Sequence, residues 1–259
     1  MSVEVSPDLA HDTDGTISQA KELWDRLDRP NVMIKIPATE AGIPAIAATL
    51  GAGINVNITL IFGLDRYAQV MGAFFDGFEQ RVANGHDVAG LASVASFFVS
   101  RVDTETDRRL PEGDPLRGKA AVANAKLAYQ RFLATFTGAR WEALRAKGAR
   151  VQRPLWASTS TKNPAYSPTL YVDTLIGRDT VNTLAQGSID ALAAGQGDLR
   201  ADTVLEGVDD AHAAMAGLAD AGIDFDDVTA TLENEGVASF SASFRDAVDT
   251  LEKKSRELT

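Results

Sequence analysis

The sequence predicts an α/β protein built around a parallel sheet, and two patterns support this prediction. Short runs rich in β-branched and apolar residues alternate with longer amphipathic stretches along most of the chain. Such alternation is typical of β/α units, in which a helix returns the chain to the start of the next parallel strand. The runs are apolar on both faces, which suits either a (β/α) barrel or an open doubly wound sheet.

Each element follows from its local pattern. The apolar runs predict six strands, at residues 2–6, 31–36, 54–62, 93–100, 151–158 and 180–184. Helical periodicity, with an acidic cap before the first helix, predicts helices at residues 14–28, 39–53, 64–85 and, as one or two helices, 119–148.

Two further segments are assigned from their composition. Residues 101–118 are strongly polar and follow a strand directly, so we expect a loop there, the position at which barrel enzymes build their active sites. Residues 200–259 are acidic and have a helical pattern. We expect this last quarter to pack as helices on the domain formed by residues 1–199.

Composition excludes several classes of protein. The chain has 259 residues with 45% hydrophobic content, which is enough for one substantial core. It contains no cysteine, and its three histidines lie far apart in the sequence, so neither a disulfide framework nor a metal site is expected. A net charge of -11 argues against nucleic acid as a partner, because phosphate backbones need clustered lysine and arginine.

The sequence also argues against a membrane partner. No stretch of about 18 apolar residues is present, and the first twelve residues lack the basic and apolar regions of a signal peptide. We therefore expect a soluble cytoplasmic protein. The acidic composition leaves the oligomeric state open.

Polar side chains stand near the C-terminal ends of several predicted strands. The set consists of Glu4, Lys35, Asn57, Thr59, Ser96, Arg101, Ser158 and Lys162. The strand ends of a parallel barrel converge on one mouth, so these residues could meet although they are scattered in the sequence.

Lys35 gives this set a chemical meaning, because it interrupts the apolar run NVMIKIP at residues 31–37. Burial disfavours the ammonium form of a lysine, and the free amine can attack a carbonyl group. The resulting Schiff base accepts electrons and permits cleavage or formation of an adjacent carbon–carbon bond. Asparagine and serine could hold sugar hydroxyls, Arg101 and Lys162 could hold a phosphate, and Glu4 could position or deprotonate a water.

Each residue also has a structural explanation. A strand lysine is usually at a sheet edge or extends its ammonium to solvent. The cluster from Ser158 to Thr161 could cap a loop, Arg101 could form a surface ion pair, and Glu4 could face solvent. Their coincidence at successive strand ends favours a functional site over these separate explanations.

Four stretches of the sequence closely resemble transaldolases, and more narrowly the longer form found in actinobacteria and similar bacteria. The stretches are VMIKIPATEAGIPAI, GINVNITLIF, SVASFFVSRVDTETD and WASTSTKNPAYSPTLYVDTLIGRDTVNTL. The resemblance covers residues from about 2 to about 195. It implies a (β/α)8 TIM barrel that transfers a dihydroxyacetone unit between sugar phosphates of the pentose phosphate pathway, through a lysine Schiff base and without a metal or organic cofactor.

The resemblance also implies a role for each residue of the set. Lys35 would be the Schiff-base lysine, and Glu4 with Thr59 would hold the catalytic water. The substrate-binding residues would be Asn57 and Ser96 for hydroxyls, Phe98 for the pocket wall, Arg101 and Ser158 for the phosphate, and Lys162 as a second phosphate-binding cation.

The sequence departs from the family pattern in one respect. In the family, two further β/α units precede the strand that carries Glu4, and they provide an aspartate that acts as general acid and base. Neither unit is matched here, so the resemblance implies an incomplete barrel of about six strands over residues 1–199. Two alternatives to a transaldolase therefore stay open: another Schiff-base sugar-phosphate aldolase, and an inactive fragment that only binds sugar phosphates.

Overall fold

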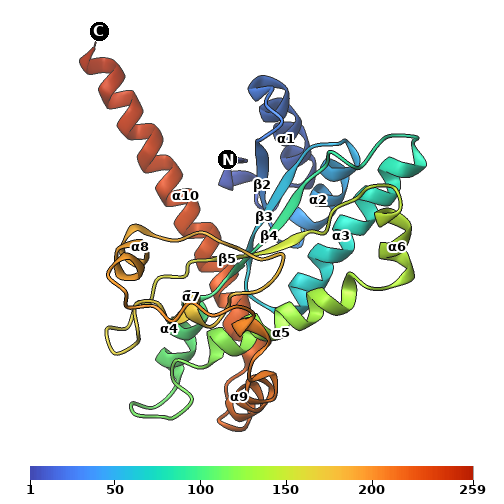
Figure 1. Cartoon of the computed structure of the whole chain (residues 1–259). Helices are drawn as coiled ribbons and strands as arrows, with labels where there is room; N and C mark the ends of the chain where they lie inside the picture. Colours follow the sequence, from blue (N-terminus) through green and yellow to red (C-terminus); the bar gives the residue numbers. More distant parts are fainter. Residues whose placement is uncertain (259) are drawn as a thin grey trace.

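The computed structural model describes residues 1–258, and its centre is a six-stranded parallel sheet with helices around it (Figure 1). The strands are β1 (Ser2–Glu4), β2 (Met33–Pro37), β3 (Val56–Ile61), β4 (Ser93–Phe98), β5 (Arg153–Ala157) and β6 (Val181–Asn182). Each strand pairs in parallel with the next one in the sequence. All six predicted strands are therefore confirmed.

The strand order distinguishes the two architectures that the sequence left open. It runs from β1 to β6 without reversal, whereas a doubly wound sheet reverses its order at a switch point. The chain therefore winds as a (β/α) barrel does. Within residues 1–258, β1 and β6 each have one paired neighbour, so the barrel is incomplete, as the sequence predicted.

Helices cover the outer face of the sheet. Those that follow β1 to β4 and precede β5 are α1 (Thr13–Leu27), α2 (Gly42–Gly51), α3 (Leu64–Ala83), α4 (Ser100–Arg109), α5 (Ala120–Thr135) and α6 (Ala139–Arg145). Shorter elements are η1 (Pro7–Leu9), α7 (Leu170–Asp173), α8 (Gln186–Ala193) and η2 (Thr203–Leu205). The core lies between sheet and helices, where Ile34, Ile36 and Ile58 are 0% exposed.

The prediction of a loop over residues 101–118 was wrong. Helix α4 occupies Ser100–Arg109, and the connection to α5 begins only after it. The polar residues Asp103, Thr106 and Asp107 of this helix are buried, not solvent-exposed. A helix that buries hydrogen-bonded polar side chains has no apolar stripe, so periodicity cannot reveal it.

The buried carboxylates of α4 are held by hydrogen bonds. Asp103 accepts one from the backbone N–H of Ala121 at 2.8 Å and one from the hydroxyl of Tyr171 at 2.7 Å. Burial nevertheless dominates and raises the pKa of Asp103 to about 6, and the charge of nearby Asp107 acts in the same direction.

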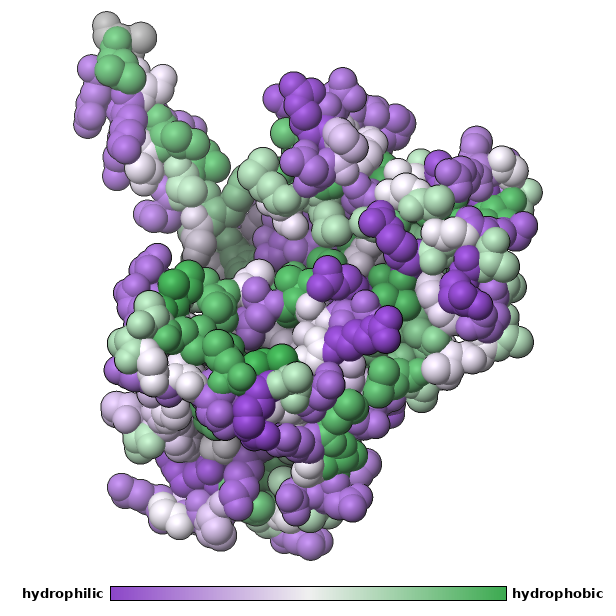
Figure 2. All heavy atoms as spheres, viewed as in Figure 1, coloured by the Kyte–Doolittle hydropathy of each residue, from purple (hydrophilic) through white to green (hydrophobic). Residues whose placement is uncertain are grey.

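The acidic C-terminal part is helical, as predicted, and consists of α9 (Val208–Asp220) and α10 (Phe225–Glu257). The first half of α10 crosses the carboxyl ends of the strands. Thr229 faces Gly63, which follows β3, and Gly236 faces Leu60 of β3. From residue 242 onward α10 is exposed, and it projects away from the rest of the molecule (Figures 1 and 2).

The close contact between α2 and α3 yields a first prediction. A Cβ atom added at Gly77 of α3 would lie 2.6 Å from the carbonyl oxygen of Ala47 in α2, whereas at Gly72 it would meet nothing within 4 Å. Gly77→Ala should lower the free energy of unfolding by about 1–3 kcal/mol, because the backbone carbonyl has to move. Gly72→Ala, the matched control, should raise it by about 0.5–1 kcal/mol. Urea unfolding measures both, and equal effects would contradict this packing.

The raised pKa of Asp103 yields a second prediction. A carboxyl group with a raised native pKa favours folding fully below its unfolded pKa near 3.8, and this contribution is lost as the pH rises to about 6. The free energy of unfolding of the wild type should therefore fall between pH 4 and pH 6 relative to that of Asp103→Asn, by on the order of 3 kcal/mol. Parallel curves for the two proteins over this range would refute the assignment.

Candidate active site

The parallel register places three polar residues in one row across the sheet. Glu4 of β1 pairs with Lys35 of β2, and Lys35 pairs with Asn57 of β3. The ammonium of Lys35 donates a hydrogen bond to Glu4 at 3.1 Å. The side chains of Lys35 and Glu4 are 23% and 31% exposed, so the pair is largely buried but still open to a ligand on one side.

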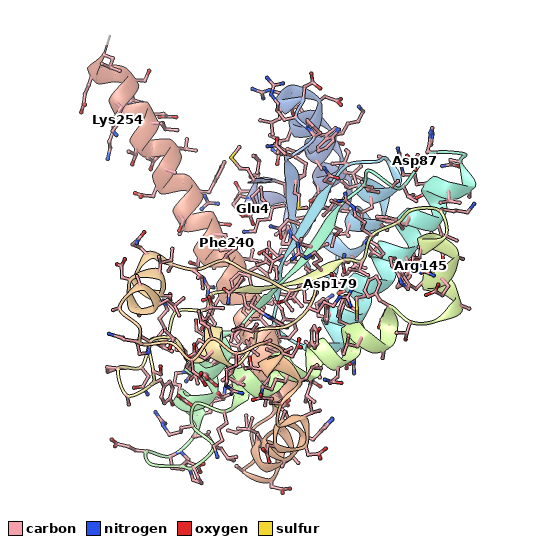
Figure 3. The ribbon with its side chains drawn as sticks, in the orientation of Figure 1. Glu4, Asp87, Arg145, Asp179, Phe240 and Lys254 are labelled. Carbon is pink, nitrogen blue, oxygen red and sulfur yellow. The ribbon has the colours of Figure 1, made fainter. Side chains whose placement is uncertain are left out.

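A phenyl ring covers the same lysine. The Lys35 Nζ lies 5.1 Å from the ring centroid of Phe240, which belongs to α10. Figure 3 shows Glu4 and Phe240 close together, the first from the sheet and the second from the crossing helix. A cation over an aromatic face is attracted by the ring quadrupole. Lys35 is thus held between a carboxylate and a ring, and the ring was not predicted from the sequence.

Asn57 is fixed at both ends of its amide. Its Oδ1 accepts a hydrogen bond from the Ser96 hydroxyl at 2.7 Å, and its Nδ2 donates to the Ser2 hydroxyl at 3.0 Å. Asn57 and Ser96 are both buried. The structure therefore brings together two of the residues predicted to contact sugar hydroxyls.

Thr59 lies two residues after Asn57, closer to the carboxyl end of β3. It is fully buried, and its hydroxyl has no hydrogen-bond partner among residues 1–258. An unpaired buried hydroxyl costs stability, so it is usually explained by an ordered water or a ligand. The next residue, Leu60, has a left-handed φ of 60° at a β-bulge, and such strain is common beside functional sites.

Arg101 lies in the first turn of α4, directly after β4. Its guanidinium is 5.4 Å from the ring of Phe98, which in turn packs against Phe62 at 5.2 Å. Across the described part of the chain, Arg101 makes no hydrogen bond or ion pair. Five N–H donors therefore remain available at a helix N-terminus, which is a favourable arrangement for binding an anion.

Ser158 adjoins the start of the same helix. Its hydroxyl lies 2.9 Å from that of Ser100, and its carbonyl accepts the Ser100 N–H at 3.0 Å. The structure thus brings Ser158 next to the residue that precedes Arg101. Lys162 is exposed and lines a cavity of about 270 Å³ that includes neither Arg101 nor Ser158 in its lining.

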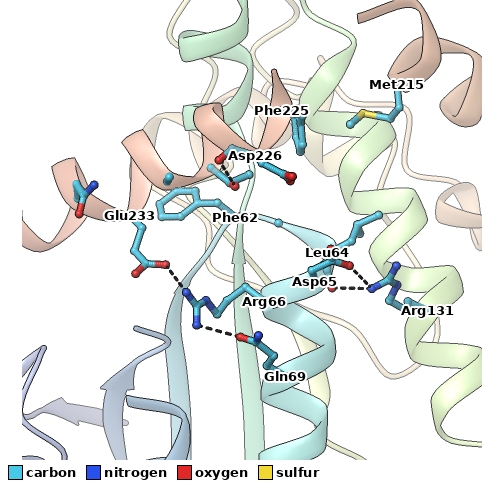
Figure 4. Close-up of a pocket in the computed structure, with 14 residues that line it drawn as sticks. Phe62, Leu64, Asp65, Arg66, Gln69, Arg131, Met215, Phe225, Asp226 and Glu233 are labelled. Atoms are coloured by element: carbon cyan, nitrogen blue, oxygen red, sulfur yellow. Dashed lines mark hydrogen bonds and ion pairs between the residues drawn. The ribbon is translucent and has the colours of Figure 1, made fainter. Parts of the chain in front are cut away.

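A larger cavity, of about 440 Å³, lies at the base of α10 and contains none of the predicted site residues (Figure 4). Four of its charged side chains form two ion pairs: Arg66 with Glu233 at 3.4 Å, and Arg131 with Asp65 at 3.0 Å. Burial raises the pKa of Glu233. These pairs join α10 to α3 and α3 to α5, so we assign this cavity to the anchoring of α10.

Within residues 1–258, no group of three or more histidine, aspartate or glutamate side chains is arranged to hold a metal ion. None of the helices in that range combines the length and the apolar character that a bilayer crossing requires.

Fold and site together define a barrel-type α/β protein with an amine-centred polar site at the carboxyl ends of its strands. The family model described as Transaldolase/Fructose-6-phosphate aldolase matches residues 1–251. The chain therefore belongs to the transaldolase/fructose-6-phosphate aldolase family.

Individual relatives agree with this assignment. A transaldolase of Acidothermus cellulolyticus is 54% identical over 265 residues, which cover 99% of this chain and 71% of the relative. Transaldolase 1 of Streptomyces avermitilis is 52% identical and covers 97% of this chain and 68% of the relative. A transaldolase of Mycolicibacterium paratuberculosis is 53% identical, and the match covers 98% of this chain and 69% of the relative. The chain thus spans about 70% of the length of these relatives.

The unpaired hydroxyl of Thr59 yields a third prediction. Thr59→Val keeps the shape of the side chain and removes the unsatisfied group, so the free energy of unfolding should stay the same or rise by about 1 kcal/mol. If the hydroxyl holds a water for imine formation, the rate of Schiff-base formation on Lys35 should fall about tenfold or more.

Thr49 of α2 offers a matched control, because its buried hydroxyl also lacks a partner among residues 1–258 but lies away from the site. Thr49→Val should have the same effect on stability and leave Schiff-base formation unchanged. Equal rates for the two variants would show that the Thr59 hydroxyl has no role in the chemistry.

Proposed function

We propose that this chain is a transaldolase of the pentose phosphate pathway. It transfers a dihydroxyacetone unit from sedoheptulose 7-phosphate to glyceraldehyde 3-phosphate, giving erythrose 4-phosphate and fructose 6-phosphate. Curated transaldolases at about 50% identity over nearly the whole chain support this function. The observation that carries it is the position of Lys35, 3.1 Å from Glu4 and in register between Glu4 and Asn57.

In the proposed mechanism, the amine of Lys35 attacks the carbonyl carbon of the ketose. Loss of water, held by Glu4 and the free hydroxyl of Thr59, gives an iminium ion. The C4 hydroxyl of the ketose gives its proton to this water, and the C3–C4 bond breaks. Its electrons move into the iminium to form an enamine, and the shorter aldose leaves. The enamine attacks the acceptor aldehyde, and water releases the new ketose from Lys35.

The remaining residues of the set are proposed to bind substrate, except Lys162, which lines a separate cavity. Asn57, oriented by Ser96, holds the hydroxyls of the dihydroxyacetone unit. The guanidinium of Arg101 and the hydroxyl of Ser158 hold the phosphate at the N-terminus of α4. Phe98 supports Arg101 from below and forms part of the pocket wall. All these substrates are soluble sugar phosphates, which is consistent with an enzyme of the cytoplasm.

A second candidate function comes from the family description, which includes fructose-6-phosphate aldolase. An aldolase releases its three-carbon unit as free dihydroxyacetone, whereas a transaldolase keeps it on the lysine until an acceptor arrives. A coupled assay with and without an acceptor aldose separates the two reactions. Product formation that depends on the acceptor supports the transferase, and equal turnover without it supports the aldolase. Sugar-phosphate binding without turnover in either assay would support a chain that only binds.

The role of Lys35 yields a fourth prediction. Borohydride reduction in the presence of fructose 6-phosphate should leave one dihydroxyacetone unit on the peptide that contains Lys35, as read by intact mass and peptide mapping. Lys35→Met should abolish the adduct. Lys147→Met, which removes an exposed lysine beyond α6, should retain it. An adduct on another lysine, or none on the wild type, would overturn the proposed function.

A further inference from the structure

The segment that carries Ser158 has little structure of its own. Residues 158–169 connect β5 to α7 without forming a helix or strand. Ser158 itself has a left-handed φ of 56°, which is unfavourable for a residue with a Cβ atom. Such a conformation persists only where surrounding contacts impose it, so the contacts of this segment decide where Ser158 lies.

Two carboxylates of helix α4 provide these contacts, and both make the same set of hydrogen bonds. Asp103 and Asp107 lie one turn apart on one face of the helix. Asp103 accepts the hydroxyl of Tyr171 at 2.7 Å, and Asp107 accepts that of Tyr166 at 2.5 Å. The second oxygen of each carboxylate accepts a backbone N–H at 2.8 Å, from Ala121 in the first turn of α5 and from Gly118 just before it. Each pair thus ties the segment and α7 to α4.

Neither carboxylate has a charged partner. Both are buried, and no ion pair with Asp103 or Asp107 occurs in residues 1–258. The nearby Arg117 donates to the backbone carbonyl of Asp107, not to its carboxylate. Buried carboxylates that form no ion pair are a poor means of stabilising a fold, which favours a role in positioning.

The first turn of α4 carries the residues next to which the segment places Ser158. It carries Ser100, which makes two hydrogen bonds to Ser158, and Arg101, whose guanidinium is unoccupied. The segment is therefore joined to α4 near both ends of the helix, through Ser158 at the start and through Tyr166 at the last turn. A shift of the segment along α4 would separate Ser158 from Arg101.

We propose that Tyr166 and Tyr171 are positioning residues that hold the segment 158–169 and α7 against α4, and that they thereby set the affinity of Arg101 and Ser158 for the substrate phosphate. The inference rests on the proposed function, because it takes Arg101 and Ser158 as the phosphate site. It assigns no chemical step to either tyrosine.

A tyrosine-to-phenylalanine change removes the hydroxyl and leaves the ring in place. Tyr166→Phe should raise the half-saturating concentration of fructose 6-phosphate in borohydride trapping about tenfold, because one hydrogen bond to a charged acceptor is lost. Tyr171→Phe should act in the same direction. Trapping of dihydroxyacetone, which reaches Lys35 without a phosphate, should stay unchanged in both variants.

Tyr129→Phe is the matched control. The hydroxyl of Tyr129 also donates to a single acceptor, the carbonyl of Arg178 at 3.0 Å, but it lies on α5 away from the segment. This variant should behave as the wild type with both ligands. Thermal unfolding of all variants confirms that each is folded at the assay temperature.

The outcomes distinguish a failure of the proposed function from a failure of the inference about Tyr166 and Tyr171. A wild type that is trapped by neither ligand refutes the proposed function, and the inference with it. A wild type that is trapped by both, with an unchanged fructose 6-phosphate dependence in Tyr166→Phe, overturns the inference alone. Equal weakening for both ligands also overturns it, because the tyrosine would then act on the whole site.

Hydrogen exchange gives a measurement that is independent of turnover. Inorganic phosphate should slow the exchange of backbone amides in residues 158–162 of the wild type and of Tyr129→Phe. The Tyr166→Phe protein should need about tenfold more phosphate for the same protection. Identical phosphate dependence in all three proteins would contradict the positioning role.

Discussion

The arrangement of the site depends on the register between the first three strands. Successive side chains of a strand point to opposite faces, so a slip of one residue in β2 would turn Lys35 into the helices and Ile34 or Ile36 toward Glu4. Both isoleucines are fully buried on the opposite face. The apolar packing of that face therefore fixes the position of the lysine, and the chemistry of the concave face is a consequence of the core behind it.

The geometry of the site also depends on helix packing at the carboxyl ends of the strands, where two residues have strained backbones. Leu60 and Ser158 both have left-handed backbone conformations where β3 and β5 approach the site. Leu60 is held by α10, which approaches so closely that a Cβ atom at Gly236 would lie 2.8 Å from the Leu60 side chain. Ser158 is held by α4. Helices from two different parts of the chain thus impose local geometries that neither strand would adopt alone.

The sequence predicted what depends on local pattern. Six strands were predicted because an apolar run bounded by turn residues can be recognised from the local sequence alone. Lys35 was identified because it interrupts one of these runs. Helix α4 was missed because Asp103 and Asp107 are buried through hydrogen bonds, a property that depends on partners far along the chain. Phe240 was missed for the same reason, since periodicity predicts an amphipathic helix but not the strand that it crosses.

The position of Phe240 near the end of the sequence has a consequence for synthesis. Arg245 of α10 also pairs with Asp8 near the start of the chain, and these two residues are 237 positions apart in the sequence. The ribosome adds residues in order, so Lys35 leaves it before the ring that covers it exists. At roughly 5–20 residues per second, the interval is about 10 to 40 s. The nascent chain therefore displays its lysine uncovered until translation reaches the last helix.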